Sequence, residues 1–274
     1  MLLSRNVGSA QTTRIVLPNH DLHNHTIFSG HADDDATIAN LAARANELHL
    51  DVLGLSEHLM REEDMDIYQA FQQEARRHLS DGTQILVGVE MDIDPMDPSG
   101  RWVAPAITCD YVILSAHGFP QFDLGLPESD LRLPLPIAKR RLAMRYLEWY
   151  GLAVAGGGMH ILGHPLREAI KMGLIDLADE EMLEASVAVF RPAAEKGTAF
   201  ELNEPLLEYL DSAGQLKDYI NLIRRLRSIG MRFARGSDSH SIATVGASEM
   251  ITRAAAAVGL SAADWIDPRS LLRR

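Results

Sequence analysis

The 274-residue sequence contains a single cysteine, Cys109, and no long apolar run. One cysteine allows neither an internal disulfide nor a cysteine-ligated zinc site, and we expect Cys109 as a packing residue in a reducing cytoplasm. No segment approaches the roughly 20 apolar residues that span a bilayer, and the N-terminus lacks the apolar core of a signal peptide. We therefore expect a cytoplasmic protein without membrane contact, in which residues 1–14 form a loosely ordered extension.

Positive charge is also scarce, because 26 lysines and arginines stand against 38 acidic residues, for a formal net charge of -12. This balance disfavours a general affinity for nucleic acid, which normally needs a basic face. The hydrophobic content of 46% is ample for a packed core. No repeat or low-complexity linker divides the chain, so we expect one domain over residues 1–274.

Short apolar runs alternate with amphipathic segments along the chain. Apolar residues indicate helices in five segments: 34–50, 66–80, 136–151, 179–196 and 216–230. Strands are predicted at seven places: 15–17, 51–58, 84–93, 109–118, 159–165, 198–203 and 232–240. Strands that alternate with helices imply a parallel sheet, which is most economically closed as an α/β barrel.

Polar side chains stand at the end of every predicted strand. They are mostly imidazoles and carboxylates: His23 and His25, Glu57 and His58, Glu90, His117, His164, Glu201 and Asn203, and Asp238 and His240. The C-terminal ends of barrel strands converge on one mouth, where active sites are built. Imidazole and carboxylate ligands without thiolate suit zinc, manganese or iron. The sequence therefore predicts a metal site at this mouth.

The repetition of this chemistry over several strand ends carries the prediction, since a lone histidine is more often a packing residue than a ligand. In the stretch HDLHNHTIFSGHADDD, His23 and His25 alternate along an extended chain, so both side chains can face one metal. Four histidines lack such a placement and are not expected as ligands: His20, His49, His78 and His160.

With these motifs in view, the chain resembles the polymerase and histidinol phosphatase (PHP) family. The resemblance runs over nearly the whole chain: DLHNHT, SGHA, GLSEH, GVEMD, DYVILSAH, GHP, FELN and GSDSH. It implies a distorted seven-stranded, TIM-like (β/α) barrel that holds three divalent metal ions for phosphoester hydrolysis. The implied ligands are His23, His25, His31, His58, Glu90, His117, His164, Asp238 and His240. Among them, Glu90, Asp238 and His240 are the catalytic candidates.

Within the family, SGHA, GVEMDI with DYVILSAH, and FELN are most similar to the stand-alone histidinol-phosphate phosphatases of histidine biosynthesis. The segment GHPLREAIKMG departs from that branch, many members of which carry a longer basic or Asp-containing stretch there. The resemblance implies that a metal-bound hydroxide attacks a small-molecule phosphate monoester. Histidinol phosphate is the candidate substrate.

Two features are candidates for substrate binding. Arg167 comes three residues after His164, where a guanidinium could bind phosphate bidentately; the alternative is a surface arginine at the start of a helix. Segments 92–109 and 118–136 read as long loops, which are unusual in a compact domain unless they serve function. We expect them to form a substrate lid or a selectivity wall.

Two other functions stay open beside the small-molecule phosphatase. A nucleotide or nucleic-acid phosphodiesterase would want a basic groove, which the acidic balance disfavours. A non-catalytic, metal-stabilised module that binds a partner would fit the metal site, although the ligand set has no gaps. We expect the phosphatase.

Overall fold

The computed structural model describes residues 17–60, 64–78, 82–94, 97, 107–118 and 134–273. The predicted N-terminal extension and most of the two predicted loops lie outside these described residues. Within the described ranges, no helix is long and apolar enough to cross a membrane.

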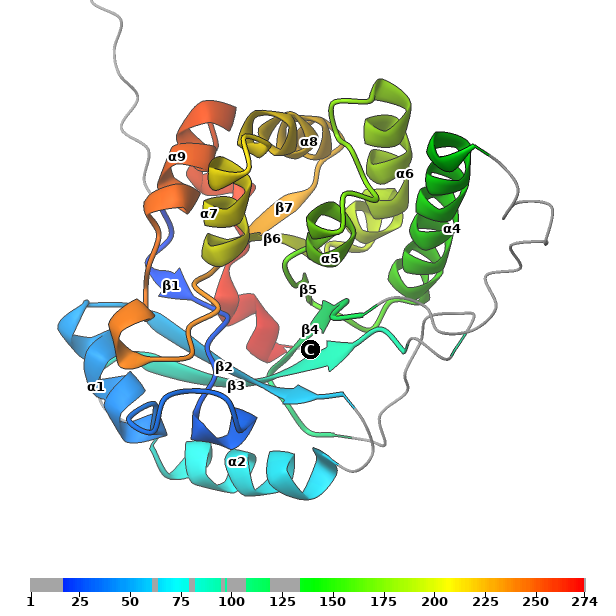
Figure 1. Cartoon of the computed structure of the whole chain (residues 1–274). Helices are drawn as coiled ribbons and strands as arrows, with labels where there is room; N and C mark the ends of the chain where they lie inside the picture. Colours follow the sequence, from blue (N-terminus) through cyan, green and yellow to red (C-terminus); the bar gives the residue numbers. More distant parts are fainter. Residues whose placement is uncertain are drawn as a thin grey trace, which may run out of the picture.

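Seven parallel strands form one sheet in the order of the sequence, as predicted. They are β1 (His20–Asp21), β2 (Val52–Leu59), β3 (Gln84–Asp92), β4 (Tyr111–Ser115), β5 (Ile161–Leu162), β6 (Ala199–Asn203) and β7 (Arg232–Gly236). The sheet curls into a nearly closed barrel (Figure 1), because the Leu22 N–H donates to the Arg235 carbonyl at 3.0 Å and Asn24 forms a bridge with Ser239. The predicted α/β, TIM-like barrel is thereby confirmed.

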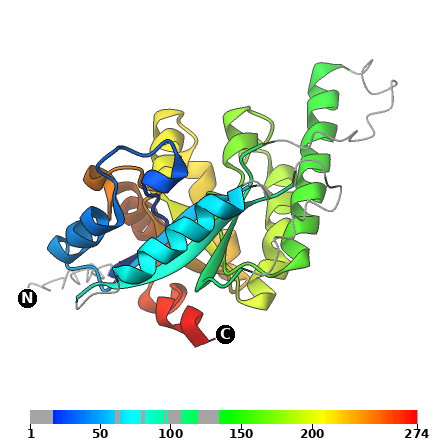
Figure 2. The ribbon, with the colours of Figure 1, turned by 90° about the horizontal axis from the view of Figure 1, so that it is seen from below.

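Helices cover the outside of the barrel, with α1 and α2 on one side and α4, α6 and α8 on the other (Figures 1 and 2). The described α-helices are α1 (Ile38–Glu47), α2 (Met65–Arg77), α4 (Leu135–Gly156), α5 (Arg167–Lys171), α6 (Glu180–Lys196), α7 (Glu204–Ser212), α8 (Leu216–Ser228) and α9 (Glu249–Val258). Short 3-10 turns lie at η1 (Ile27–Ser29), η3 (Ile242–Thr244), η4 (Ala262–Asp264) and η5 (Pro268–Arg273). The five predicted helices are confirmed, whereas α5, α7 and α9 were not predicted.

The first strand of the described residues lies after the apolar run 15–17, where a strand was predicted. Residues 15 and 16 lie outside the described residues, Leu17 belongs to no strand, and β1 is His20–Asp21. The Asp21 carboxylate accepts hydrogen bonds from the Ser237 backbone N–H at 2.9 Å and from its hydroxyl at 2.6 Å. A search for apolar runs misses this strand because a buried polar pair joins it to the chain that follows β7.

Helix α1 illustrates why the amphipathic segments fold as predicted. The Thr37 side chain accepts a hydrogen bond from the Asn40 N–H at 3.2 Å and caps the first turn. Leu41 and Ala45 follow at helical spacing and are fully buried against β2 and β3, in a cluster that includes Phe71 of α2. Burial of a leucine or phenylalanine side chain contributes about 1.5–3 kcal/mol, so this apolar face holds the helices on the sheet.

Apolar side chains fill the end of the barrel where the strands begin. Val52, Ile161 and Ala199 start their strands there, and they share a buried cluster with Ile266 and Leu271 of the C-terminal segment. Figure 2 shows this segment, in red, below the sheet. Because this end is closed by apolar packing, the polar residues that end the strands gather at the opposite end.

Candidate metal centre

The side chains predicted from the strand ends converge at one mouth of the barrel. Among the expected ligands, His58 and Glu90 lie within β2 and β3, and six come from the chain just beyond a strand: His23, His25, His117, His164, Asp238 and His240. The two histidines that follow β1 face each other, with 3.1 Å between His23 Nε2 and His25 Nε2. The prediction that these two rings share one target is therefore consistent with their geometry.

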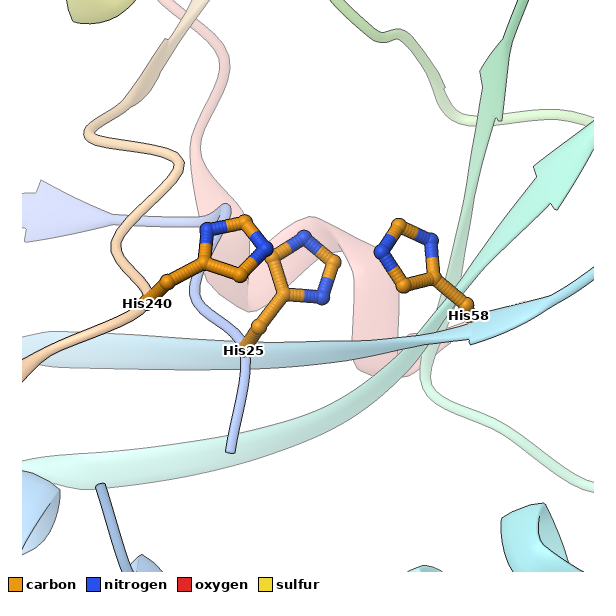
Figure 3. A group of neighbouring side chains, drawn as sticks. All are labelled: His25, His58 and His240. Atoms are coloured by element: carbon orange, nitrogen blue, oxygen red, sulfur yellow. The ribbon is translucent and has the colours of Figure 1, made fainter. Parts of the chain in front are cut away.

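Three groups of side chains in the described part of the chain could each hold a metal ion. They are His25, His58 and His240; His23, His25 and Asp238; and His58, Glu90 and His117. Within each group the candidate ligand atoms all lie within 4.8 Å of one another. Figure 3 shows the ring of His25 between those of His58 and His240, and each of the two ring pairs has a centroid distance of 4.3 Å.

The hydrogen bonding at the centre of the cluster fits a bound cation. Glu90 Oε2 is buried and accepts no hydrogen bond from any described residue, although His58 Nδ1 lies 3.0 Å away and His25 Nε2 lies 3.4 Å away. Buried polar atoms normally have partners, so such an orphaned oxygen among imidazole nitrogens needs an explanation. A divalent cation would satisfy it, because carboxylate and imidazole are both ligands of zinc, manganese and iron.

The two carboxylates of the cluster are held in their charged form. Burial alone would raise the pKa of Glu90, but the imidazoles of His23, His117 and His164 hold it well below its ordinary value. Burial also opposes ionisation of Asp238, and neighbouring imidazoles again outweigh it and hold the pKa well below its ordinary value. Both carboxylates are therefore available as anionic ligands.

The pKa is raised for some imidazoles of the cluster and lowered for others. Burial would lower the pKa of His23, but the carboxylates of Glu201 and Glu90 raise it well above its ordinary value. Carboxylates likewise outweigh burial at His25. At His240, burial and the nearby ring of His25 lower the pKa to about 4. Protons on some rings thus balance the carboxylates, and bound metal ions would take their place.

Two residues of the cluster have backbone conformations that residues other than glycine rarely adopt. His164 has φ 27° and Asp238 has φ 50°, both in the left-handed region. Such conformations cost about 1–3 kcal/mol each and persist where the surrounding structure over-determines them, often at functional sites. The fold thus accepts backbone strain at two of the residues that it directs into the mouth.

Five histidines remain, and one of them, His31, contacts a histidine of the cluster. His31 lies in the turn after η1, and its Nε2 is 2.8 Å from His240 Nε2, so this ring joins the rim of the cluster. His78 ends α2 and contacts Glu74 at 3.0 Å, while His160 Nδ1 accepts a hydrogen bond from the Val112 N–H. None of the four histidines that were not expected as ligands belongs to the three candidate groups. The expected ligands His31 and His164 also lie outside these groups.

Arg167 lies beside the cluster rather than on a remote surface. It is the first residue of α5, and its Nη1 is 3.6 Å from Asp238 Oδ2. Its Nε donates to Glu168 at 2.7 Å, and the side chain is 19% exposed. The guanidinium therefore reaches the mouth while keeping contact with solvent.

Two buried acids support the cluster, Glu57 and Glu201, which were predicted at strand ends without a role of their own. Glu201 Oε1 lies 2.7 Å from His23 Nδ1. Glu57 accepts a hydrogen bond from the Thr26 N–H, and its other oxygen is 3.9 Å from His25 Nδ1. The available signal was a charged residue inside an otherwise apolar strand, because such a residue is rarely buried without a partner.

Together the fold and the cluster define an α/β barrel with a candidate metal centre at the C-terminal ends of its strands. The chain belongs to the PHP domain family, whose model matches residues 21–205. Asp238 and His240 lie beyond the matched region. A comparison with curated proteins finds no significant sequence match.

Solved structures with a similar fold include two bacterial proteins. A histidinol phosphate phosphatase from Lactococcus lactis, in complex with zinc, L-histidinol and phosphate, has a TM-score of 0.53 and 19% identity, over 86% of this chain and 93% of that one. A putative histidinol phosphatase from Listeria monocytogenes has a TM-score of 0.58 and 16% identity, over 83% of this chain and 97% of that one. At these identities the likeness establishes a shared fold.

Proposed function

We propose that the protein is a metal-dependent phosphatase that hydrolyses a small-molecule phosphate monoester, with histidinol phosphate as the candidate substrate. The observation that carries the proposal is the orphaned Glu90 carboxylate oxygen among converging imidazoles. Membership of the PHP domain family supports phosphoester chemistry. The Lactococcus lactis neighbour, in complex with zinc, L-histidinol and phosphate, supports the choice of metal and substrate.

Nine residues would hold up to three divalent ions of zinc, manganese or iron: His23, His25, His31, His58, Glu90, His117, His164, Asp238 and His240. When bound, such ions neutralise charge on the phosphoryl oxygens and lower the pKa of a coordinated water from its bulk value to about 7. The three candidate groups contain seven of these nine residues. The other two lie beside them, with His31 Nε2 at 2.8 Å from His240 Nε2 and His164 Nε2 at 3.1 Å from Glu90 Oε1.

Asp238 would orient the attacking water. Its pKa is held well below the ordinary value, so the carboxylate can accept a hydrogen bond from water. Asn203 Nδ2 donates to Asp238 Oδ2 at 3.3 Å and restrains the carboxylate from the β6 side. Arg167 Nη1 lies near the same oxygen, and its positive charge would bind the phosphate of the substrate.

The leaving group would lie in a cavity of about 340 Å³ that opens beside Asp238 and His240. Asp33 and Glu208 are exposed and contribute to its wall. An acidic wall favours a leaving group that carries a cationic amine, as histidinol does, and disfavours the further phosphates of a nucleotide. The cavity therefore favours the phosphatase over the phosphodiesterase.

Hydrolysis of histidinol phosphate tests the proposal. We expect protein loaded with zinc or manganese to release phosphate from histidinol phosphate and p-nitrophenyl phosphate. The bis-ester of p-nitrophenol should react far more slowly. Preferred hydrolysis of the bis-ester would favour the phosphodiesterase, and metal binding without turnover of any ester would favour a non-catalytic module.

A further inference from the structure

The carboxylate of Glu201 contacts two members of the metal cluster at once. Glu201 lies in β6 and is 1% exposed. Its Oε1 is 2.7 Å from His23 Nδ1, and its Oε2 accepts a hydrogen bond from the His164 backbone N–H at 2.6 Å. A single side chain thereby joins the chain after β1 to the chain after β5.

The contact with His23 determines which ring nitrogen faces the centre. A carboxylate oxygen accepts hydrogen bonds, so His23 Nδ1 carries the proton that it donates to Glu201. His23 Nε2 points in the other direction, at 3.3 Å from Glu90 Oε2 and 3.6 Å from Asp238 Oδ1. A proton held at Nδ1 leaves the Nε2 lone pair free for a cation at that point.

The contact with His164 supports a strained backbone. His164 has φ 27°, and its N–H would be buried without a partner if Glu201 moved away. The ring of His164 reaches the cluster, with 3.1 Å between Nε2 and Glu90 Oε1. The same carboxylate that orients the His23 ring therefore fixes the backbone from which the His164 ring projects.

The barrel makes room for Glu201 through a glycine on the neighbouring strand. A Cβ atom at Gly236, the last residue of β7, would lie 1.9 Å from Glu201 Oε1 and 2.8 Å from the Cβ of His23. Both separations are too short for non-bonded atoms, and the end of the Glu201 side chain would have to move. Glycine at this position is thus a steric condition for the contact.

We propose that Glu201 is a positioning residue that sets the ring tautomer of His23 and the backbone of His164 for metal binding. The proposal rests on the proposed metal centre and extends it to a residue outside the ligand set. An amide cannot replace the carboxylate, because glutamine has one acceptor oxygen, whereas three donors face Glu201: His23 Nδ1, the His164 N–H and Asn203 Nδ2. If the amide N–H₂ turned to His23, the ring proton would shift to Nε2 and block the metal.

The test is the zinc affinity of the full-length Glu201→Gln variant, measured by competition with a chromophoric chelator. We expect the affinity to fall by about 10- to 100-fold, as for other carboxylates that orient metal-bound histidines. Glu204→Gln is the matched control, because Glu204 is also buried and accepts two backbone hydrogen bonds, from Met250 at 2.8 Å and Ile251 at 2.9 Å. In the described part of the chain it forms no hydrogen bond with a cluster histidine. The control should lower the melting temperature of the metal-free protein without lowering zinc affinity.

Glu201→Asp provides a second route, since it keeps the carboxylate but shortens the side chain by one methylene, so that it cannot contact His23 and the His164 N–H as Glu201 does. We expect a similar loss of zinc affinity, and this variant decides the matter if Glu201→Gln does not fold. Wild-type zinc affinity in the folded variants, or an equal loss in Glu204→Gln, would overturn the role of Glu201. Wild-type protein that binds zinc but hydrolyses no phosphoester would instead overturn the proposed function and leave this role standing.

Discussion

Arg167 Nη1 lies 3.6 Å from Asp238 Oδ2, so the first residue of α5 reaches the carboxylate that follows β7. The two side chains come from distant parts of the sequence and meet at the barrel mouth. Under the proposed function, the guanidinium would bind the phosphate of the substrate and the carboxylate would hold water or metal.

Replacement of Arg167 by alanine should weaken substrate binding and leave the hydrolytic groups in place. The loss of a hydrogen bond to a charged group costs about 1.5–3 kcal/mol, and most of it should appear as a higher KM for p-nitrophenyl phosphate. Arg167→Lys, the matched variant, should recover part of the loss because it keeps the charge without the bidentate geometry. Unchanged kcat and KM in the alanine variant would remove Arg167 from the substrate site.

Removal of the metal ions should destabilise the protein. The cluster buries the carboxylates of Glu90 and Asp238 among imidazoles, and ions that bind only the native state stabilise it by mass action, by about 4 kcal/mol at a concentration 1,000 times Kd. We expect a lower melting temperature after chelation and recovery on addition of zinc. An unchanged melting curve, with metal loss proven by elemental analysis, would show that the cluster is peripheral to the fold.

His20 should make stability depend on pH independently of the metal cluster. It is 3% exposed, and burial together with the charge of Arg235 lowers its pKa to about 3. Below about pH 6.5, His20 binds a proton in the unfolded state but not in the native state. The free energy of unfolding therefore falls as the pH drops from neutral. The loss should be about 1.4 kcal/mol per pH unit between pH 6.5 and about 3.

Urea denaturation of chelated protein between pH 7 and pH 5 measures this effect. His20→Gln should flatten the pH dependence relative to the wild type, whatever its effect on stability at pH 7. His49→Asn is the control, because His49 is exposed at the end of α1 and asparagine tolerates its φ of 56°. Equal slopes in the wild type and His20→Gln would contradict the assignment.

The sequence predicted the barrel and the convergence of the cluster because strand ends carry a repeated chemistry. It did not predict helix α7, which begins directly after Asn203, the last residue of β6. The side-chain oxygen of Asn203 caps α7 by accepting a hydrogen bond from the Leu206 N–H at 3.0 Å. The side-chain N–H₂ of the same residue donates to Asp238, and one-dimensional patterns do not separate these two roles. Helix α5 was not predicted because it has only five residues and no side-chain cap.

The support provided by Glu201 could not be predicted from the sequence. Its partner His23 is 178 residues away in the chain, and the space between them exists only because Gly236 lies on the adjacent strand. Local patterns report the type of residue at a strand end, whereas the choice between ligand and support depends on distances across the barrel. Glu201 and Asn203 were therefore recognised as polar strand ends without a role.

The most direct test of the account is turnover by Asp238→Asn, with the metal content of the same samples measured. Asparagine keeps the shape and one oxygen but removes the charge that would orient the attacking water and help to hold the metal. We expect turnover of every phosphoester to fall by about 100-fold or more relative to the metal-loaded wild type. Near-normal turnover by Asp238→Asn with its metals in place would contradict the account.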